Sequence, residues 1–208
     1  MPPLMPSSPF VDHTPASAPA ASRRALEATT RHLGYLPTAV ARMAASPQLL
    51  DGFQRLTGLF EATTLDPVAR EVVVMTVAVR NECHLCVVMH TRKLRALTPA
   101  PDRVEELIAA LGEQRPLADE RLEAVRRFAL AVLAAAGGVD DASLDAFLAH
   151  GYTERNALEV VLGIGTYTLS TLANRLTRAP VDPPMLLAAT AAAAAPGPAP
   201  APCPAPAG

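Results

Sequence analysis

Two cysteines, a histidine and a glutamate are spaced in this sequence so that they could carry thiol chemistry. Cys83, Cys86 and His90 follow one another at i, i+3 and i+7, so on a helix that begins near Cys83 their side chains share one face. Two thiols one helical turn apart can form a disulfide, and a helix N-terminus stabilises a thiolate. Glu71 lies on the preceding helical stretch, which could return antiparallel and bring its carboxylate to the same face. The four residues therefore form a candidate redox site with a nucleophile, a resolving thiol, a proton shuttle and an orienting acid.

The roles of the two thiols depend on two competing effects. The helix N-terminus favours Cys83 as the thiolate by roughly 0.3–1 kcal/mol, and this effect fades beyond the first turn. His90 lies at i+4 from Cys86, and a general base typically accelerates a step by about 10²–10⁴-fold, or about 3–5 kcal/mol. Because the second effect is larger, we expect Cys86 to attack and Cys83 to resolve. His90 and Glu71 would then form the proton relay.

Two other interpretations of the cysteines stay open. A zinc site usually takes four ligands, commonly from two CxxC pairs. The sequence has no second pair, so a zinc site would have to use His90 or His84 together with Glu71. Buried unreactive cysteines are also common. The joint spacing of two thiols, an imidazole and a carboxylate favours redox chemistry over both, and we expect no metal and no cofactor.

The charge and hydropathy of the chain argue against several classes of partner. Lys and Arg together number 18 against 20 Asp and Glu, a net charge of −2. No basic run is longer than Arg126-Arg127, so a nucleic-acid interface is not expected. The most apolar stretch, residues 160–172, is shorter than the roughly 18 residues that span a bilayer. The N-terminal residues lack the basic and apolar pattern of an export signal, so we expect a soluble cytoplasmic protein with no membrane contact.

Helix-capping residues, prolines and glycines predict an all-α protein. Aromatic residues make up 4% of the chain and Trp is absent, a composition that suits closely packed helices better than a sheet sandwich. Start and stop signals predict eight or nine helices, four of which we expect to be capped by Asp66, Asp102, Asp140 and Thr153. The clearest helices cover residues 49–61, 67–80, 83–96, 102–111, 119–136, 140–150 and 153–178.

Proline content marks the expected ends of the folded region. Twelve of the 21 prolines lie in residues 1–20 and 191–208. We therefore expect a disordered Pro/Ala-rich head over residues 1–21 and a disordered Ala/Pro-rich tail over residues 187–208, which includes Cys203. Residues 22–186 would form a single helical domain, long enough to bury a core.

The spacing of Glu71, Cys83, Cys86 and His90 resembles the active-site motif of the alkylhydroperoxidase D (AhpD)-like proteins of the carboxymuconolactone decarboxylase superfamily. The resemblance covers most of residues 30–185, and it includes Leu36-Pro37, Ser46-Pro47, Asn174-Arg175 and Asp182. It implies an all-helical, usually oligomeric domain that reduces hydroperoxides with the cysteine pair, with Cys86 attacking, and that is re-reduced by a dithiol protein.

At one position the sequence departs from this motif. Leu85 stands where the well-studied hydroperoxidase members have a second histidine, immediately before the second cysteine. His84 lies about 100° away around the helix and is not expected to replace it. The departure bears on the efficiency of peroxide turnover more than on the fold.

These observations predict a thiol-dependent, peroxidase-like oxidoreductase whose partners are a hydroperoxide, a dithiol reductant protein and further copies of the chain. The last helix supports the oligomer, because it is apolar on more than one face; one stripe contains Leu158, Val161, Leu162, Gly165, Leu169 and Leu172. Two alternatives remain. One is a decarboxylase-type lyase that acts on a small acid or lactone with His90 as proton donor, which does not need two cysteines. The other is a non-enzymatic redox- or zinc-sensing helical module.

Overall fold

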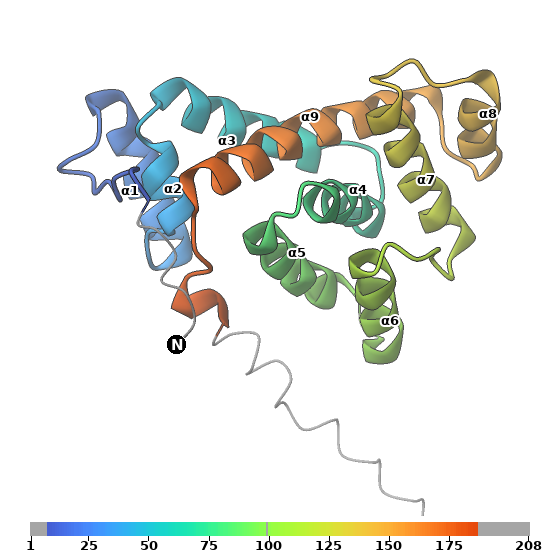
Figure 1. Ribbon diagram of the computed structural model, residues 1–208, viewed down its shortest axis with the longest axis horizontal. Coiled ribbons are helices and arrows are strands. Elements are labelled where there is room, and N and C mark those ends of the chain that lie inside the picture. The colour runs from blue at the N-terminus through green and yellow to red at the C-terminus, as the bar shows by residue number, and fades with distance from the viewer. Residues whose placement is uncertain (1–7, 99, 187–208) are drawn as a thin grey trace, which may run out of the picture.

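A computed structural model of the chain describes residues 8–98 and 100–186, which form helices and loops. No strand is found among these residues, so the predicted all-α class is confirmed. The helices are α1 (Ala20–Leu33), α2 (Thr38–Met43), α3 (Pro47–Glu61), α4 (Pro67–Arg80), α5 (His84–Leu97), α6 (Pro101–Gly112), α7 (Glu120–Ala134), α8 (Asp141–Ala149) and α9 (Glu154–Thr177). Figure 1 shows α9 running across the molecule beside α3, with α1 and α2 at one end, α7 and α8 at the other, and α4, α5 and α6 beneath.

The centre of the domain is α4, which is buried on every side. Each side chain from Glu71 to Ala78 is shielded from solvent, and the helix packs against α5, α7 and α9. Glycine allows one of these helices to approach closely: a Cβ at Gly163 of α9 would lie 2.5 Å from Cε2 of Phe60 and 3.0 Å from Cγ1 of Val73. The carboxylate of Glu71 is therefore held inside the protein by packing on all sides of its helix.

Three of the four predicted N-caps are confirmed. The carboxylates of Asp66 and Asp140 accept hydrogen bonds from backbone N–H groups in the first turns of α4 and α8. Thr153 and Asn156 form a reciprocal capping box at the start of α9. These local contacts fix where three helices begin, including the helix that carries Glu71.

The predicted cap at Asp102 is wrong. Helix α6 begins at Pro101, its N-cap residue is Ala100, and Asp102 lies inside the first turn. The fixed φ of proline suits the first helical position, where no N–H is needed, so the proline decides the start of the helix. The capping-box spacing between Asp102 and Glu105 has no such role here.

The ordered chain begins earlier than the proline content predicts. The expected boundary at residue 22 lies inside α1, and residues 8–21 pack on the domain instead of being disordered. Asp12 forms an ion pair with Arg42 at 2.5 Å, Ala18 is buried, and the Ser8 hydroxyl donates to the Thr177 carbonyl at 2.7 Å. Prolines prevent regular hydrogen bonding but not the packing of an extended segment. The predicted tail over residues 187–208, with Cys203, lies outside the described residues, as do residues 1–7.

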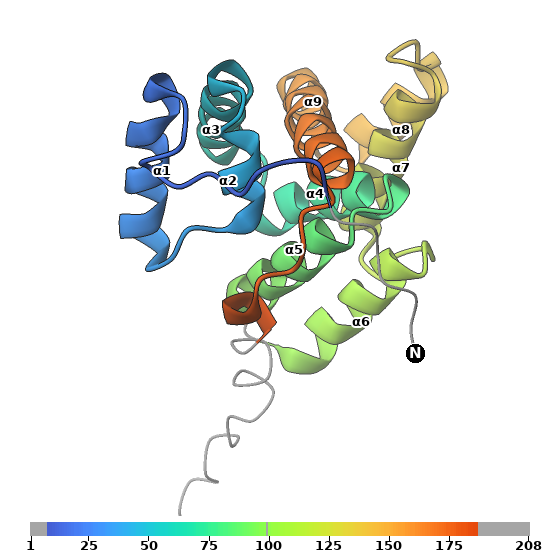
Figure 2. The ribbon, with the colours of Figure 1, turned by 60° about the vertical axis from the view of Figure 1, so that its left-hand side comes forward.

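After α9 the chain turns back beside α5 and covers the apolar cluster around the cysteines. The buried carboxylate of Asp182 accepts hydrogen bonds from the Thr38 N–H at 3.1 Å and from the Thr38 hydroxyl at 2.6 Å. Val181 and Met185 pack into the cluster. We call residues 179–186 the C-terminal strap; it is the orange-red segment that runs down beside α5 in Figures 1 and 2.

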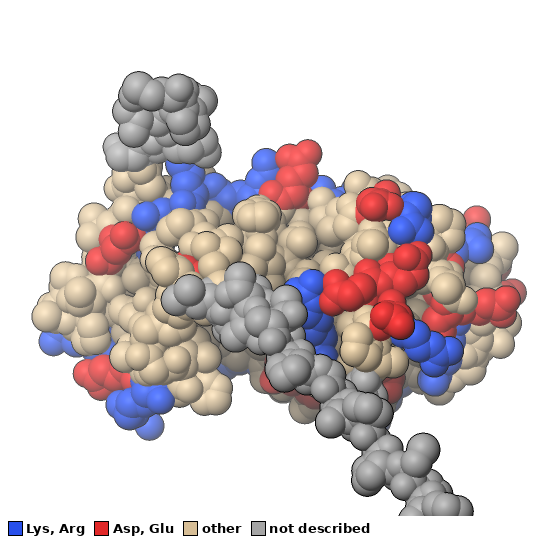
Figure 3. Space-filling model, turned by 90° about the horizontal axis from the view of Figure 1, so that it is seen from below, with Lys and Arg blue, Asp and Glu red and all other residues tan. Residues whose placement is uncertain are grey.

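The surface is mixed in charge. Figure 3 shows acidic and basic side chains interspersed over one face of the molecule. In the part of the chain that the structure describes, no helix combines the length and the apolar character needed to cross a membrane. The exposed large apolar side chains include a group on α9, formed by Leu158, Val161, Leu172 and Leu176.

Candidate active site

The turn between α4 and α5 brings the predicted site residues together. Two contacts from α9 hold this turn: the Asn81 amide donates to the Thr171 hydroxyl at 2.8 Å, and Arg175 donates to the Asn81 carbonyl at 2.6 Å. Helix α5 then packs along α4. This return, which the sequence suggested, places Glu71 of α4 in hydrogen-bond contact with His90 of α5.

Cys83 and Cys86 are free thiols at the start of α5. Cys83 occupies the N-cap position and Cys86 lies in the first turn. Their sulfur atoms are 3.0 Å apart, and each residue is only 2% exposed. A disulfide bond is about 2.05 Å long, so a movement of about 1 Å would bring the two sulfurs to bonding distance.

The two thiols differ in acidity because they share one hydrogen bond. Hydrogen bonding from Cys86 stabilises a thiolate on Cys83 and lowers the pKa of Cys83 to about 7, with a smaller contribution from the charge of Arg175. The same hydrogen bond, together with burial and the charge on Cys83, raises the pKa of Cys86. In the resting dithiol the first proton therefore leaves Cys83.

Asn174 of α9 belongs to the site, although the sequence analysis gave it no chemical role. Its side-chain N–H donates to the Cys86 sulfur at 3.3 Å. Its side-chain oxygen is buried and has no hydrogen-bond partner within the described structure. A signal was present in the sequence, because α9 carries a buried polar stripe at i, i+3, i+4 and i+7 formed by Tyr167, Ser170, Thr171 and Asn174. Buried polar side chains on an otherwise apolar helix need partners, and here one partner is the thiol.

His90 is oriented by a buried carboxylate. Its Nδ1 lies 2.6 Å from Oε2 of Glu71, and the two residues are 8% and 2% exposed. Burial alone would raise the pKa of Glu71, but the hydrogen bond and charge of His90, together with Lys93, outweigh it and hold that pKa below its usual range. The rings of His90 and Tyr167 are nearly perpendicular to each other, with their centroids 5.2 Å apart. With Nδ1 bound to Glu71, Nε2 is the nitrogen left to exchange a proton.

Neither residue between the two cysteines contributes a polar group to the site. Leu85 is buried and packs with Ala39 and Ala78 in the apolar cluster around the sulfurs. His84 is exposed. Among the described residues, no group of three or more His, Cys, Asp or Glu side chains is placed to hold a metal ion. The zinc alternative therefore lacks a ligand set in this part of the chain.

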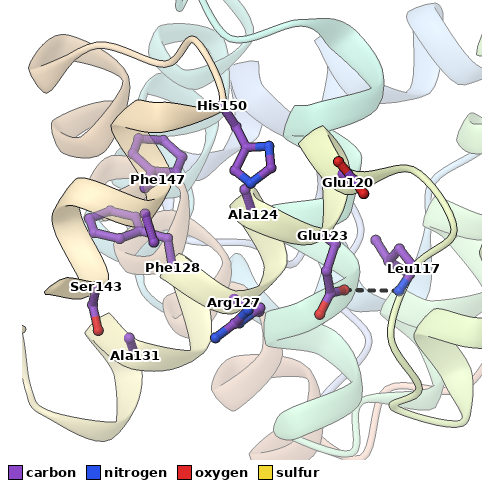
Figure 4. A pocket seen from close by; sticks show the side chains of 11 residues that line it. Leu117, Glu120, Glu123, Ala124, Arg127, Phe128, Ala131, Ser143, Phe147 and His150 are labelled. Atoms are coloured by element: carbon purple, nitrogen blue, oxygen red, sulfur yellow. Dashed lines mark hydrogen bonds between the residues drawn. The ribbon is translucent and has the colours of Figure 1, made fainter.

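Two open cavities lie away from the sulfurs. One, of about 510 Å³, lies between α7 and α8, and Figure 4 shows the rings of Phe128 and Phe147 and the imidazole of His150 along its wall. The other, of about 730 Å³, lies between the start of α4, α6 and α7. None of the four predicted site residues lines either cavity, and both sulfurs are buried, so the dithiol is enclosed by protein.

The sequence of the central helices matches one protein family. Residues 47–129 match the sequence model of the carboxymuconolactone decarboxylase family. This stretch runs from the start of α3 into α7 and contains all four predicted site residues. Among curated proteins, no sequence match is found.

Several solved structures share the fold. The AhpD core of an uncharacterised peroxidase-related protein from Ralstonia eutropha JMP134 has a TM-score of 0.74 and 22% identity, covering 88% of this chain and 97% of that chain. A peroxidase-related protein from Silicibacter sp. TM1040 has a TM-score of 0.69 and 20% identity, with coverage of 89% and 96%. The debrominase Bmp8, solved with 2,3,4-tribromopyrrole, has a TM-score of 0.64 and 16% identity, with coverage of 91% and 98%. At these identities the likeness establishes the fold.

Proposed function

Because the chain is an AhpD-like member of the carboxymuconolactone decarboxylase superfamily, we propose that it is a thiol-dependent oxidoreductase that reduces hydroperoxides through Cys83 and Cys86. The observation that carries this proposal is a pair of buried free thiols with sulfurs 3.0 Å apart, on the same helix as a histidine that a buried glutamate orients. A dithiol at this distance is a two-electron donor, and the imidazole supplies a proton carrier beside it.

Cys83 is the first thiol to ionise in the resting pair, but the proposed reaction uses the Cys86 thiolate, which forms when Cys86 gives its proton to Nε2 of His90. The Cys86 thiolate attacks the terminal oxygen of the hydroperoxide, the O–O bond breaks, and the leaving alkoxide takes the proton from His90. Cys86 is then a sulfenic acid and the first product is an alcohol. Cys83 attacks the Cys86 sulfur, water leaves, and the disulfide forms. One hydroperoxide and two thiols are thus converted to one alcohol, one water and one disulfide.

Asn174 supports both steps of this sequence. A hydrogen-bond donor stabilises a thiolate on either sulfur because the acceptor is then charged. The Asn174 amide accordingly contributes to lowering the pKa of Cys83 and limits the rise in the pKa of Cys86. The nitrogen of this amide donates to the Cys86 sulfur at 3.3 Å, whereas its buried oxygen has no hydrogen-bond partner within the described structure. We infer that this amide holds the anionic sulfur in place while the proton moves to His90.

Re-reduction of the disulfide requires two further thiols. A disulfide between Cys83 and Cys86 is opened by thiolate attack on one of its sulfurs, through a mixed disulfide. A reductant protein with its own cysteine pair completes this exchange without releasing a half-reduced intermediate. We therefore propose a dithiol protein as the electron source, and a cytoplasmic location fits the reducing conditions that this exchange needs.

A thiol count tests the proposed function. Cys203 is the third cysteine of the chain, so the experiment uses a Cys203→Ser background. One equivalent of hydrogen peroxide is expected to remove both remaining thiols, and dithiothreitol is expected to restore them. In the same background Cys86→Ser should retain its one thiol under these conditions. Peroxide that leaves both thiols of the parent protein free would contradict the proposal.

A second electron acceptor follows from the debrominase neighbour. A dithiol can also reduce a carbon–bromine bond: the aryl bromide and two thiols give the debrominated arene, a disulfide and hydrogen bromide. Bmp8 is a debrominase with this fold, so 2,3,4-tribromopyrrole is a direct comparison substrate. Faster thiol loss with tribromopyrrole than with hydrogen peroxide would assign the same dithiol to dehalogenation.

We further propose that the chain forms a homo-oligomer through α9. Four apolar residues of this helix are arranged symmetrically about Gly165: Leu158 and Leu172 stand seven residues on either side, and Val161 and the half-buried Leu169 stand four. Leu158 is 72% exposed and Leu172 is 56% exposed. In an antiparallel pair of α9 helices that crosses at Gly165, each apolar residue would meet its symmetric counterpart, as a two-fold interface requires.

The glycine at the centre of this stripe supports the same pairing. A Cβ at Gly165 would meet nothing within 4 Å, so the fold of the single chain does not need glycine there. Glycine inside a helix costs about 1 kcal/mol relative to alanine. A close helix crossing from a second copy supplies a reason for this cost.

Light scattering tests the oligomer. The full chain is expected to elute as a multiple of 21.8 kDa at micromolar concentration, and Leu158→Glu is expected to shift it toward the monomer by placing a charge in the apolar stripe. Leu33→Glu is the matched control, because Leu33 is 48% exposed at the end of α1, away from α9. A wild-type protein that elutes as a monomer, or equal effects of the two changes, would argue against this interface.

A further inference from the structure

One lysine connects the buried site with the surface. Lys93 is the only lysine among 18 basic residues of the chain. Its Nζ lies 3.0 Å from Oε1 of Glu71 and 2.7 Å from Oε1 of Glu61. The Lys93 side chain is 40% exposed and the Glu61 side chain 51%, whereas that of Glu71 is 2% exposed. Lys93 thus reaches from solvent to the carboxylate that orients His90.

The two oxygens of Glu71 have different partners. Oε2 binds Nδ1 of His90, and Oε1 binds Lys93. A buried carboxylate is costly unless it is paired and hydrogen-bonded, and these two contacts supply both requirements. The compact ammonium of lysine reaches one oxygen of the carboxylate and leaves the other to the imidazole.

We propose that Lys93 is a positioning residue of the thiol site, which holds Glu71 ionised and in place and offsets the negative charge that Glu71 presents to His90. The role in turnover rests on the function proposed above, whereas the electrostatic link between Lys93 and His90 rests on the contacts alone. Lys93 touches neither sulfur, so it acts through Glu71 and His90.

The sign of the effect follows from the charges that face His90. A carboxylate in contact with an imidazole stabilises the imidazolium and raises the pKa of the histidine, whereas a nearby ammonium opposes this. The groups around the pair come from four helices: Glu61 from α3, Arg70 and Glu71 from α4, Cys86 and Lys93 from α5, and Tyr167 from α9. Lys93 is the cation in direct contact with Glu71, so its removal leaves the carboxylate charge facing His90 without compensation.

Lys93 acts by its charge and not by carrying a proton. Burial lowers the pKa of Lys93, but the two carboxylates outweigh burial and hold that pKa above its usual range. The ammonium therefore stays protonated at and somewhat above neutral pH. Its neutral isostere, methionine, removes the charge while keeping most of the side-chain volume.

The experiment compares Lys93→Met and Lys93→Arg with wild type in the full chain. The His90 ring signal is followed by NMR against pH and assigned by its loss in His90→Gln. In Lys93→Met the titration midpoint of His90 is expected to rise by about one pH unit. The rate of thiol oxidation by hydrogen peroxide should fall by at most about tenfold, most strongly at pH values below the midpoint, and recover at higher pH, because a smaller fraction of His90 is in the base form. Lys93→Arg keeps the charge and should restore the wild-type midpoint.

A matched control is Arg95→Met on the same helix. Arg95 also pairs with an exposed glutamate, Glu105 of α6, at 2.6 Å, but has no contact with Glu71. A midpoint in Lys93→Met that stays within about 0.2 pH units of wild type, that moves down, or that Arg95→Met reproduces would overturn the proposal. If wild type itself fails to oxidise its thiols with peroxide, the proposed function fails, and the His90 titration still decides the role of Lys93.

Discussion

Replacing Cys86 with serine is expected to reduce peroxide-dependent thiol oxidation to the uncatalysed level. The loss should exceed the roughly 10²–10⁴-fold that general-base assistance contributes, because the nucleophile is removed along with its base. Trapping with dimedone identifies the attacking sulfur. In a Cys83→Ser protein the sulfenic acid should accumulate on Cys86, since no resolving thiol remains to condense with it. Mass spectrometry of the labelled peptide checks this result.

The opposite assignment makes a distinct prediction. The pKa of Cys83 is lowered to about 7 by its hydrogen bond from Cys86, which makes Cys83 the more acidic thiol of the resting pair. If acidity decided the reaction, dimedone would label Cys83 in the Cys86→Ser protein and leave Cys86 unlabelled in the Cys83→Ser protein. That pattern would exchange the roles of the two thiols while leaving the redox function in place.

The second large effect is expected for Gly163→Ala, which should lower the stability of the fold. A Cβ at this position would lie 2.5 Å from Cε2 and 2.6 Å from Cζ of Phe60, and 3.0 Å from Cγ1 of Val73. Both neighbours are fully buried, at 1% and 0% exposure, so neither can swing out of the way. Overpacking of this kind costs about 1–3 kcal/mol. Gly163→Ala should therefore lower the free energy of unfolding, measured by urea denaturation.

Gly165→Ala is the matched control, two residues along the same helix. Its Cβ would meet nothing within 4 Å, so the only change within the chain is the gain of about 1 kcal/mol in helix propensity. The two alanine variants should thus shift the urea midpoint in opposite directions at concentrations where the chain is monomeric. Equal stabilisation by both would mean that Phe60 has more room than the packing shows.

The sequence predicts the local features of this fold well because their causes are local. Asp66 followed by proline, and Thr153 with Asn156, place their side-chain acceptors over the first turns of their own helices. The meeting of Glu71 and His90 needs only two neighbouring helices and a short turn. Asp102 is not the N-cap because Pro101, one residue earlier, already occupies the first position of the helix.

Other parts of the site depend on contacts between segments far apart in the chain. Asn174 reaches Cys86 across 88 positions of sequence, and the polar stripe of α9 indicates that Asn174 needs a buried partner without indicating which one. Lys93 lies on the same helix as His90, yet its role depends on Glu61, which comes from α3. Whether residues 8–21 are ordered likewise depends on the surface against which they pack, whereas proline content describes only their own conformational preference.

Under the proposed function, we expect the C-terminal strap to limit access to the dithiol by the size of the reactant. With Asp182 bound to Thr38 and Met185 packed in the cluster around the sulfurs, a peroxide needs far less room to arrive than another protein does. A reductant protein has to bring its own thiolate into line with one sulfur of the disulfide. We expect this approach to require that the strap move away from the sulfurs. The two half-reactions would then have different rate-limiting steps. The rate of oxidation is set by collision with a small molecule, whereas the maximal rate of re-reduction is set by how often the contact between Asp182 and Thr38 opens.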